Sequence, residues 1–412
     1  MSISRQASSA KIMTTTAEAM RSHAGSAFFE RGFRPFFFGA GVWGALALPV
    51  WLWMFATGSD VLAYVSGREW HIHEMLYGYL AAALTGFTLT AVPNWTGRMP
   101  VVGRPLAALF AVWIAGRIAF FFSGAMPVLA AVIDSAFLIL LAGLIWREVI
   151  AGGNKRNIPV CVLVSLIALG NILFHITRLT EVTLIDETFD ERLTLVAISL
   201  LLMLIGGRIV PSFTRNWLMK RGIRDEARLP APFGPFDRST MAMTVVILLL
   251  WLFLPDWKLT AAAFALMAVR HFIRLLRWKG WTTFAEPLVT ILHAGYLWIP
   301  VWCALMAVSI AWPDVLDYST AIHALTAGAI VTMTLAVMTR ASLGHSGRPL
   351  TADRITQLIY LLAILGAIAR LFAPLSPMGY APTVHLSGTL TALAFLIFAV
   401  HYAKVFFRPR LA

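Results

Sequence analysis

The feature that most constrains this chain is a series of long apolar segments that continues from one end of the sequence to the other. A helix needs roughly 20 apolar residues to cross a hydrocarbon core about 30 Å thick. About twelve segments of this kind lie at residues 36–57, 73–93, 106–123, 127–146, 158–177, 193–211, 240–255, 258–276, 286–311, 318–340, 354–373 and 384–407. They are too long and too uniformly apolar for the alternating strands of a membrane β-barrel. We therefore predict an all-α, polytopic transmembrane bundle of about twelve helices embedded in a lipid bilayer.

Composition supports this prediction, because 13% of the residues are charged, whereas a soluble domain contains about 25%. Little sequence remains outside the apolar segments, so we predict a single twelve-helix transmembrane domain over residues 31–412. Residues 1–30 are rich in Ser, Thr and Ala and have no apolar core, so we expect a flexible cytoplasmic arm and no signal peptide. Cys161 and Cys303 lie inside apolar segments, which favours small buried side chains over a disulfide or a thiolate metal site.

The cationic residues of the loops predict the orientation. With twelve crossings, the N-terminal arm, the long loop with Arg215 and Arg238, and the C-terminal Arg408 and Arg410 all fall on one side. The opposite side receives the acidic segment "TEVTLIDETFDE". Because loops that stay in the cytoplasm carry an excess of Lys and Arg, both termini are predicted to be cytoplasmic. The net charge of +13 reflects this bias, and we expect no nucleic-acid partner, which would need a soluble basic face.

Ionisable side chains at membrane depth are costly and are therefore candidates for function. The predicted topology divides most of the histidines into two groups. The outer group contains His71, His73, His175, His323 and His385, and the inner group contains His271, His293 and His345. Neutral imidazole is a common ligand of iron and copper, and a haem in a helix bundle is held by imidazoles from facing helices. Clustered histidines also occur as proton relays in transporters, so clustering alone leaves both interpretations open.

In the outer group, His71 and His73 would be about 200° apart on a helix, so only one can face a given pocket. Both could face one pocket only if the helix started between them. We expect His73 to be the better inward residue, and His71 would then bind only from the non-helical entry to the helix. We predict that His73 and His323 bind haem, with His175 or His71 as substitutes.

Other polar residues near the outer group are predicted to support this site. Glu74 could orient an imidazole, and Asn171 lies four residues before His175 on the same helix face. Arg117 could pair with Asp134 at a similar depth or hold a haem propionate.

In the inner group, His271 and His293 lie on consecutive antiparallel helices at similar depth, and His345 follows in a "GHSG" turn. Three imidazoles suit copper or zinc, so we predict a metal site, with a proton path or simple hydrogen bonding as the alternative. Arg208 in "GGRIVPSF" marks an expected break in the sixth helix. Arg340 ends the tenth helix, either as a cytoplasmic anchor or as part of a site.

Five stretches carry a resemblance to a known family: "GFRPFFFGA" (32–40), "WHIHEMLYGY" with "LTAVPNWTGR" (70–98), "GGRIVPSFTRNW" (206–217), "ILHAGYLW" (291–298) and "HALTAGAIVTMTLAVMTRASLGHSGRPL" (323–350). Together they resemble the NnrS family of membrane proteins. The resemblance implies a protein of the bacterial inner membrane that contains haem and copper. It also implies a role in nitric oxide metabolism and in tolerance of nitrosative stress during denitrification.

The arrangement is also similar to that of haem–copper oxidases and nitric oxide reductases, where histidines on the second and tenth helices bind haem. Here His73 and His323 fall on those helices, but a paired "HH" is absent, so the mechanism of those enzymes is not carried over. The sequence thus favours a haem–copper protein acting on nitric oxide or derived species. If it is an enzyme, it would be an oxidoreductase that receives electrons from a quinol or a redox partner. The alternatives are a secondary transporter of a metal or a nitrosylated complex, and a non-catalytic haem-binding sensor or scaffold. A colourless purified protein would favour the transporter, and a turnover assay would identify the sensor or scaffold.

Overall fold

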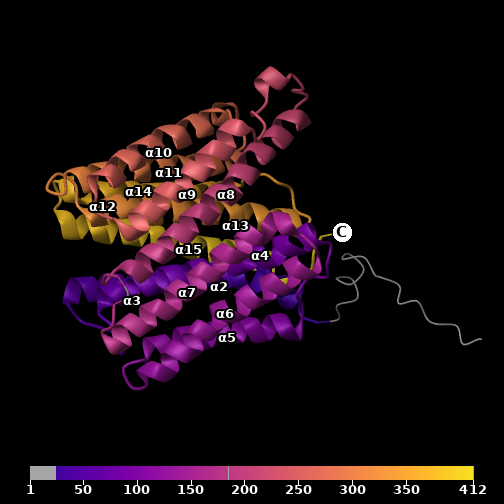
Figure 1. The fold of residues 1–412 in the computed structure, drawn as a ribbon. Coiled ribbons are helices and arrows are strands. Elements are labelled where there is room, and N and C mark those ends of the chain that lie inside the picture. Colours follow the sequence, from indigo (N-terminus) through magenta and orange to yellow (C-terminus); the bar gives the residue numbers. More distant parts are fainter. Residues whose placement is uncertain (1–24, 184, 412) are drawn as a thin grey trace, which may run out of the picture.

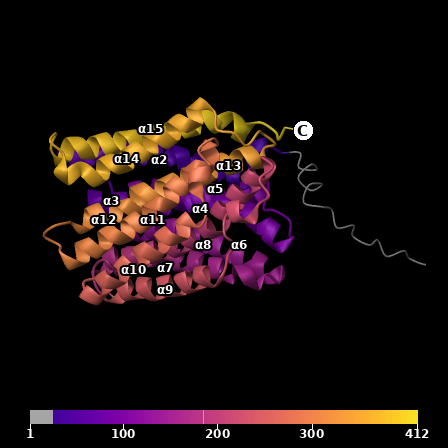
Figure 2. The same cartoon turned by 90° about the horizontal axis from the view of Figure 1, so that it is seen from above.

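The computed structural model describes residues 25–183 and 185–411, which form a bundle of roughly aligned helices (Figure 1, Figure 2). Twelve helices are long and apolar enough to cross a membrane, which confirms the predicted architecture of a multi-pass membrane protein. No strand occurs in either described range. Most of the arm that was predicted at residues 1–30 lies outside the described residues.

The bounds of the longer helices follow the apolar segments closely. They are α2 (Phe33–Thr57), α3 (Gly67–His73), α4 (Ala81–Thr96), α5 (Arg104–Phe121), α6 (Pro127–Ala151), α7 (Ile158–Thr180), α8 (Phe189–Lys220), α9 (Pro235–Phe253), α10 (Lys258–Leu276), α11 (Pro287–Ala311), α12 (Tyr318–His323), α13 (Val331–His345), α14 (Arg354–Phe372) and α15 (Tyr380–Phe407). The second crossing consists of α3, the π-helical segment η2 (Glu74–Leu80) and α4. The tenth consists of α12, the π-helical segment η6 (Ala324–Ile330) and α13.

The first crossing, α2, packs against the last, α15 (Figure 2). Small residues allow the close approach: a Cβ at Gly44 would lie 2.6 Å from the ring of Phe395. At the end of the bundle where α2 begins and α15 ends, the buried Arg34 donates to the carbonyl oxygen of Phe406 at 3.2 Å. Arg34 also pairs with Glu30 at 3.1 Å. α3 and α12 lie together at the opposite end (Figure 1).

The second and tenth crossings share a local pattern. In each, an Ile–His pair ends the first α-helix, the π-helical segment begins at the next residue, and a glycine follows the histidine by five residues, at Gly78 and Gly328. Both glycines make room for a tryptophan: a Cβ at Gly78 would lie 2.5 Å from Trp43 Nε1, and one at Gly328 would lie 2.7 Å from the Trp298 ring. π-Helical turns occur frequently at functional sites. This likeness indicates that the two histidine-bearing crossings are built in the same way.

Two local expectations from the sequence were wrong. α3 begins at Gly67, so His71 lies inside a helix and does not precede one. The reason is a capping box, in which Ser66 and Glu69 satisfy each other's backbone N–H groups and start the helix six residues before the apolar run. α8 continues without a break through Pro211 to Lys220. Its Gly206–Gly207 step provides room for side chains of neighbouring helices, since a Cβ at Gly206 would lie 3.1 Å from Tyr296.

Candidate metal centre and histidine cavity

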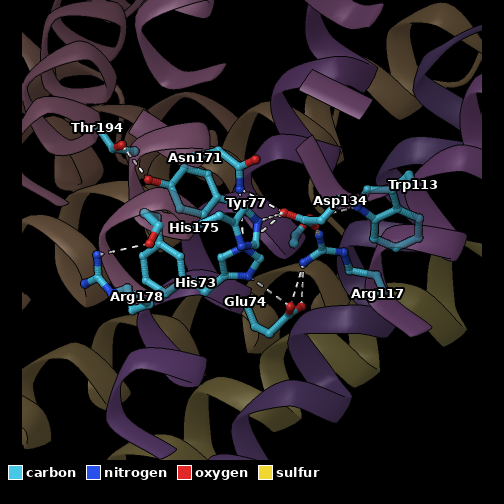
Figure 3. A network of polar contacts seen from close by, with 12 residues as sticks. His73, Glu74, Tyr77, Trp113, Arg117, Asp134, Asn171, His175, Arg178 and Thr194 are labelled. Carbon is cyan, nitrogen blue, oxygen red and sulfur yellow. Dashed lines mark hydrogen bonds and ion pairs between the residues drawn. The ribbon is translucent and has the colours of Figure 1, made fainter. Parts of the chain in front are cut away.

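A buried polar cluster lies at the α3–α12 end of the bundle (Figure 3). We call it the Asp134 cluster; its members are His73, Glu74, Arg117, Asp134, Asn171 and His175, and each of them is buried. They come from five elements in sequence order: the end of α3, the start of η2, then α5, α6 and α7. Because these crossings are neighbours in the bundle, they bring six polar side chains to one depth.

The Asp134 carboxylate is the centre of the cluster. Its Oδ2 atom lies 3.0 Å from His73 Nε2 and 2.9 Å from His175 Nε2, and it accepts a hydrogen bond of 2.9 Å from the Asn171 amide. Its Oδ1 atom accepts from Arg117. The two Nε2 atoms and a carboxylate oxygen all lie within 4.8 Å of one another. Two imidazoles and a carboxylate form a set that suits a transition-metal ion.

The other nitrogen of each imidazole also has a partner. His73 Nδ1 lies 3.2 Å from Glu74 Oε1, and His175 Nδ1 lies 2.6 Å from the hydroxyl of Tyr64. Metal-binding histidines typically have such a partner on the second nitrogen, because it fixes the tautomer and the ring orientation. Burial raises the pKa of the Tyr64 phenol, and the Asp134 carboxylate raises it further, so this group stays neutral. Both Nε2 atoms are therefore aimed at the same point.

Charge balance in the cluster favours a bound cation. Arg117 NH1 contacts both oxygens of Glu74 at 2.7 Å and Arg117 NH2 contacts Asp134, so two buried carboxylates share one guanidinium. One negative charge remains, and buried charges must be compensated. A proton on His73, which lies between the two carboxylates, would compensate it, and so would a monovalent metal ion. Phe120 stacks on the His73 ring with the centroids 3.8 Å apart and seals this side of the cluster.

A cavity of about 470 Å³ lies on the other side of α3, and we call it the histidine cavity. Its walls come from α2, α3, η2, α8, α12, η6, α14 and α15, and two histidines line it, His71 from α3 and His323 from α12. His323 Nδ1 donates to the Ser319 carbonyl oxygen at 2.6 Å, which leaves Nε2 as the free ligand atom. His71 stacks on Trp51 with the centroids 4.3 Å apart.

Two arginines, Arg68 and Arg370, also line the histidine cavity. Arg370 is buried and donates from NH2 to Ser319 Oγ at 2.8 Å. Its Nε and NH1 atoms are buried and have no hydrogen-bond partner among the described residues. A buried guanidinium with unused donors favours an anionic ligand group, particularly a carboxylate.

The family described as NnrS protein matches the chain over residues 27–410, which includes both the Asp134 cluster and the histidine cavity. The chain belongs to the NnrS family. A comparison with curated proteins found no match.

In this NnrS chain, the predicted outer residues are divided between two sites. His73 and His175 lie in the Asp134 cluster, whereas His323 shares the histidine cavity with His71. The predicted pairing of His73 with His323 is therefore not formed, because α3 presents His71 and His73 on different faces. Arg117 forms the ion pair with Asp134 and does not line the cavity, so it is not placed to hold a propionate.

The inner histidines are not brought together in the described parts of the NnrS chain. His271 lies 2.9 Å from Thr244 Oγ1 and 3.0 Å from the Tyr296 hydroxyl. His293 lies 2.7 Å from Thr214 Oγ1.

The remaining predicted residues have other partners. His345 Nδ1 is 3.4 Å from Arg31 NH1, Arg208 donates to Asn157 at 3.0 Å, and Arg340 lies over the Phe213 ring. The three-histidine inner site is thus not assembled, because each of the three histidines has different neighbours, which are hydroxyl groups for His271 and His293 and a guanidinium for His345. Arg208 and Arg340 do not belong to the Asp134 cluster, and they do not line the histidine cavity.

Sequence reasoning missed several residues of the two sites. It treated Asp134 only as a partner of Arg117, and it did not select Tyr64, Arg68 or Arg370. Arg370 carried a usable signal, since it is a charged residue within an apolar segment. Tyr64 lies in the short connection between the first two crossings, and nothing in its sequence context distinguishes it.

Proposed function

We propose that this NnrS-family protein binds haem in the histidine cavity and copper at the Asp134 cluster, and that it acts on nitric oxide or its reactive products. This activity would contribute to tolerance of nitrosative stress during denitrification. The proposed location is a bacterial inner membrane, with both termini in the cytoplasm and both sites toward the periplasmic side. A membrane quinol or a redox partner would supply electrons if the protein converts nitric oxide.

The observation that carries the haem proposal is the pairing of His71 and His323 in one cavity with Arg370. The volume of about 470 Å³ is within the range of small-molecule and cofactor sites, which is roughly 300–1,000 Å³. His323 Nε2 and His71 would face the iron, and Arg68 and Arg370 would bind the propionates. The unused donors of Arg370 fit this assignment, because an apolar ligand would leave them buried without partners.

Haem would supply an iron atom that binds the nitrogen of nitric oxide. The protein's own groups have separate tasks. The Ser319 carbonyl holds His323 in one tautomer, and Trp51 holds the His71 ring. In the Asp134 cluster, Glu74 and Tyr64 orient the two imidazoles, and His73 can hold a proton between Glu74 and Asp134 when no copper is bound.

The test is an optical spectrum of the purified protein, together with haem and metal analysis. We expect a Soret band, bound copper, and a shift of the Soret band when nitric oxide is added to the reduced protein. A colourless, copper-free protein from haem-replete and copper-replete cells would contradict the proposal and favour the transporter. A haem protein that binds nitric oxide but does not consume it with any quinol or artificial donor would be a sensor or scaffold.

A further inference from the structure

A second cavity lies next to the histidine cavity, and we call it the apolar cavity. It opens between the helices, since lining residues such as Phe87, Ile205 and Val337 are partly exposed. Its volume is about 90 Å³. It lies between the second, sixth and tenth crossings, next to α2. Its lining includes Leu80, Ala83, Ile198, Leu202, Thr334 and Val337.

The two cavities follow the same three crossings and are separated by less than one helical turn. On the second crossing, Tyr79 lines the histidine cavity and Leu80 lines the apolar cavity. On the sixth crossing, Leu195 lines the histidine cavity and Ile198 lines the apolar cavity. On the tenth, Val331 lines the histidine cavity and Thr334 lines the apolar cavity. The apolar cavity therefore follows the histidine cavity along the same three crossings, toward the membrane interior.

One hydrogen-bonded pair lies at the boundary between the cavities. The hydroxyl of Tyr79 bonds to Thr334 Oγ1, which joins the second crossing to the tenth. Thr334 Oγ1 also donates to the Ile330 carbonyl oxygen at 2.6 Å. The Tyr79 hydroxyl can therefore only donate to Thr334. This closes the boundary without leaving a free donor on either residue.

The chemistry of the lining selects the occupant. Thr334 has the only polar side chain among the described residues that line the apolar cavity, and its hydroxyl proton is already used. A buried water needs two to four polar partners, so water is disfavoured, whereas dry apolar cavities bind xenon. A volume of about 90 Å³ is also far below the roughly 300 Å³ of a site for a larger organic ligand. A small neutral diatomic molecule satisfies both limits.

We propose that the apolar cavity is a gas-holding site on an intramembrane path to the histidine cavity, with the Tyr79–Thr334 pair as the constriction between them. The ligand class is a small neutral gas, which includes nitric oxide. The path as a route to a reaction centre rests on the proposed function, whereas gas binding in the cavity does not. A neutral gas dissolves in the hydrocarbon core, so a path through the bundle gives it access without crossing the polar end of the protein.

The first experiment uses xenon as the probe. A structure of the full-length protein determined under xenon pressure is expected to show xenon between Ala83, Ile198 and Val337. Val337→Phe should fill the cavity and remove this xenon, and Ala83→Leu should do so from another helix if the first variant does not fold. Val246→Phe is the matched control, because Val246 is 58% exposed on α9. Absence of xenon from the cavity of the unmodified protein would overturn the proposal.

The second experiment measures rebinding of a gas to the proposed haem after flash photolysis of its carbon monoxide complex. Val337→Phe should slow rebinding severalfold, Tyr79→Phe should speed it, and Val246→Phe should leave it unchanged. Xenon binding with unaltered rebinding in Val337→Phe would show a closed pocket, and the path would be rejected. A colourless protein that still binds xenon here would end the haem proposal while the gas-holding site stands.

Discussion

His71 and His73 are two residues apart on α3, and they face different sites. His71 lines the histidine cavity with His323, whereas His73 contacts Asp134 at 3.0 Å. α3 therefore forms the wall between a cavity of cofactor size and a buried cluster with metal-ligand geometry. In the proposed function, residues of one helical turn would place a haem and a copper ion next to each other, an arrangement suited to chemistry on a diatomic ligand.

The haem ligands are predicted to be His71 and His323. His71→Ala and His323→Ala should each abolish or shift the Soret band, because each removes an imidazole from the histidine cavity. His385→Ala is the control: His385 lies on α15 beside Phe55, and it is not part of the cavity lining. Optical spectra and haem content of the purified variants check this. An unchanged spectrum in both single variants would rule out this pair.

Copper is predicted to depend on the Asp134 cluster. His73→Ala and His175→Ala should lose copper and keep haem, and Tyr64→Phe should weaken copper binding about 10–100-fold by removing the partner of His175 Nδ1. Metal content by mass spectrometry, with haem measured in parallel, provides the readout. His271→Ala is the control, since His271 forms hydrogen bonds with Thr244 and Tyr296 and is not part of the Asp134 cluster. If copper were lost from His271→Ala and retained in the cluster variants, the inner site would be favoured instead.

Arg117 is predicted to stabilise the fold strongly. Arg117→Met should cost about 3–5 kcal/mol, because it leaves two buried carboxylates without a cation. Arg98→Met is the comparison: its partner Glu148 is at 2.5 Å, but the Arg98 side chain is 44% exposed. Loss of an exposed pair costs at most about 1 kcal/mol. Thermal unfolding in detergent measures both variants, and equal losses would show that the Asp134 cluster is not held together by Arg117.

The π-helical segment η6 is predicted to set the direction of His323. Deleting Ala327 should convert the segment to α-helix and rotate α12 by about 100° relative to α13. His323 would then leave the histidine cavity, and the Soret band should be lost. Ala329→Ser, in the same π-helical segment but outside the cavity lining, keeps the residue count and should bind haem normally. Retention of haem by the deletion variant would mean that another histidine serves as the ligand.

Both termini are predicted to be cytoplasmic, because the cationic loops alternate with the crossings. Green fluorescent protein fused after residue 412 should fluoresce, and alkaline phosphatase fused at the same place should be inactive. The opposite pattern would invert the topology and would place both candidate sites toward the cytoplasm.

The sequence by itself determined the architecture. Twelve segments that are too long and too uniformly apolar for barrel strands form helices in lipid, because a helix satisfies its own backbone hydrogen bonds, and the described part of the chain has twelve such helices. The depth of each residue in the membrane could also be predicted, because it follows from the position of the residue along its helix. Depth identified both His73 and His323 as residues of the same end, and it brought Arg117 level with Asp134.

Only the tertiary structure decided how each helix is rotated about its axis and which helix faces meet. The capping box at Ser66 started α3 early, so that His71 and His73 both became helical and faced opposite sides. The π-helical segments change the rotation of the helices that follow them. A hydropathy pattern does not predict where such segments occur. The Asp134 cluster gathers side chains from sequence positions as distant as His73 and His175. Such a contact depends on which helix faces meet, and apolar residues occur on all faces of these helices, so the sequence carries little signal for it.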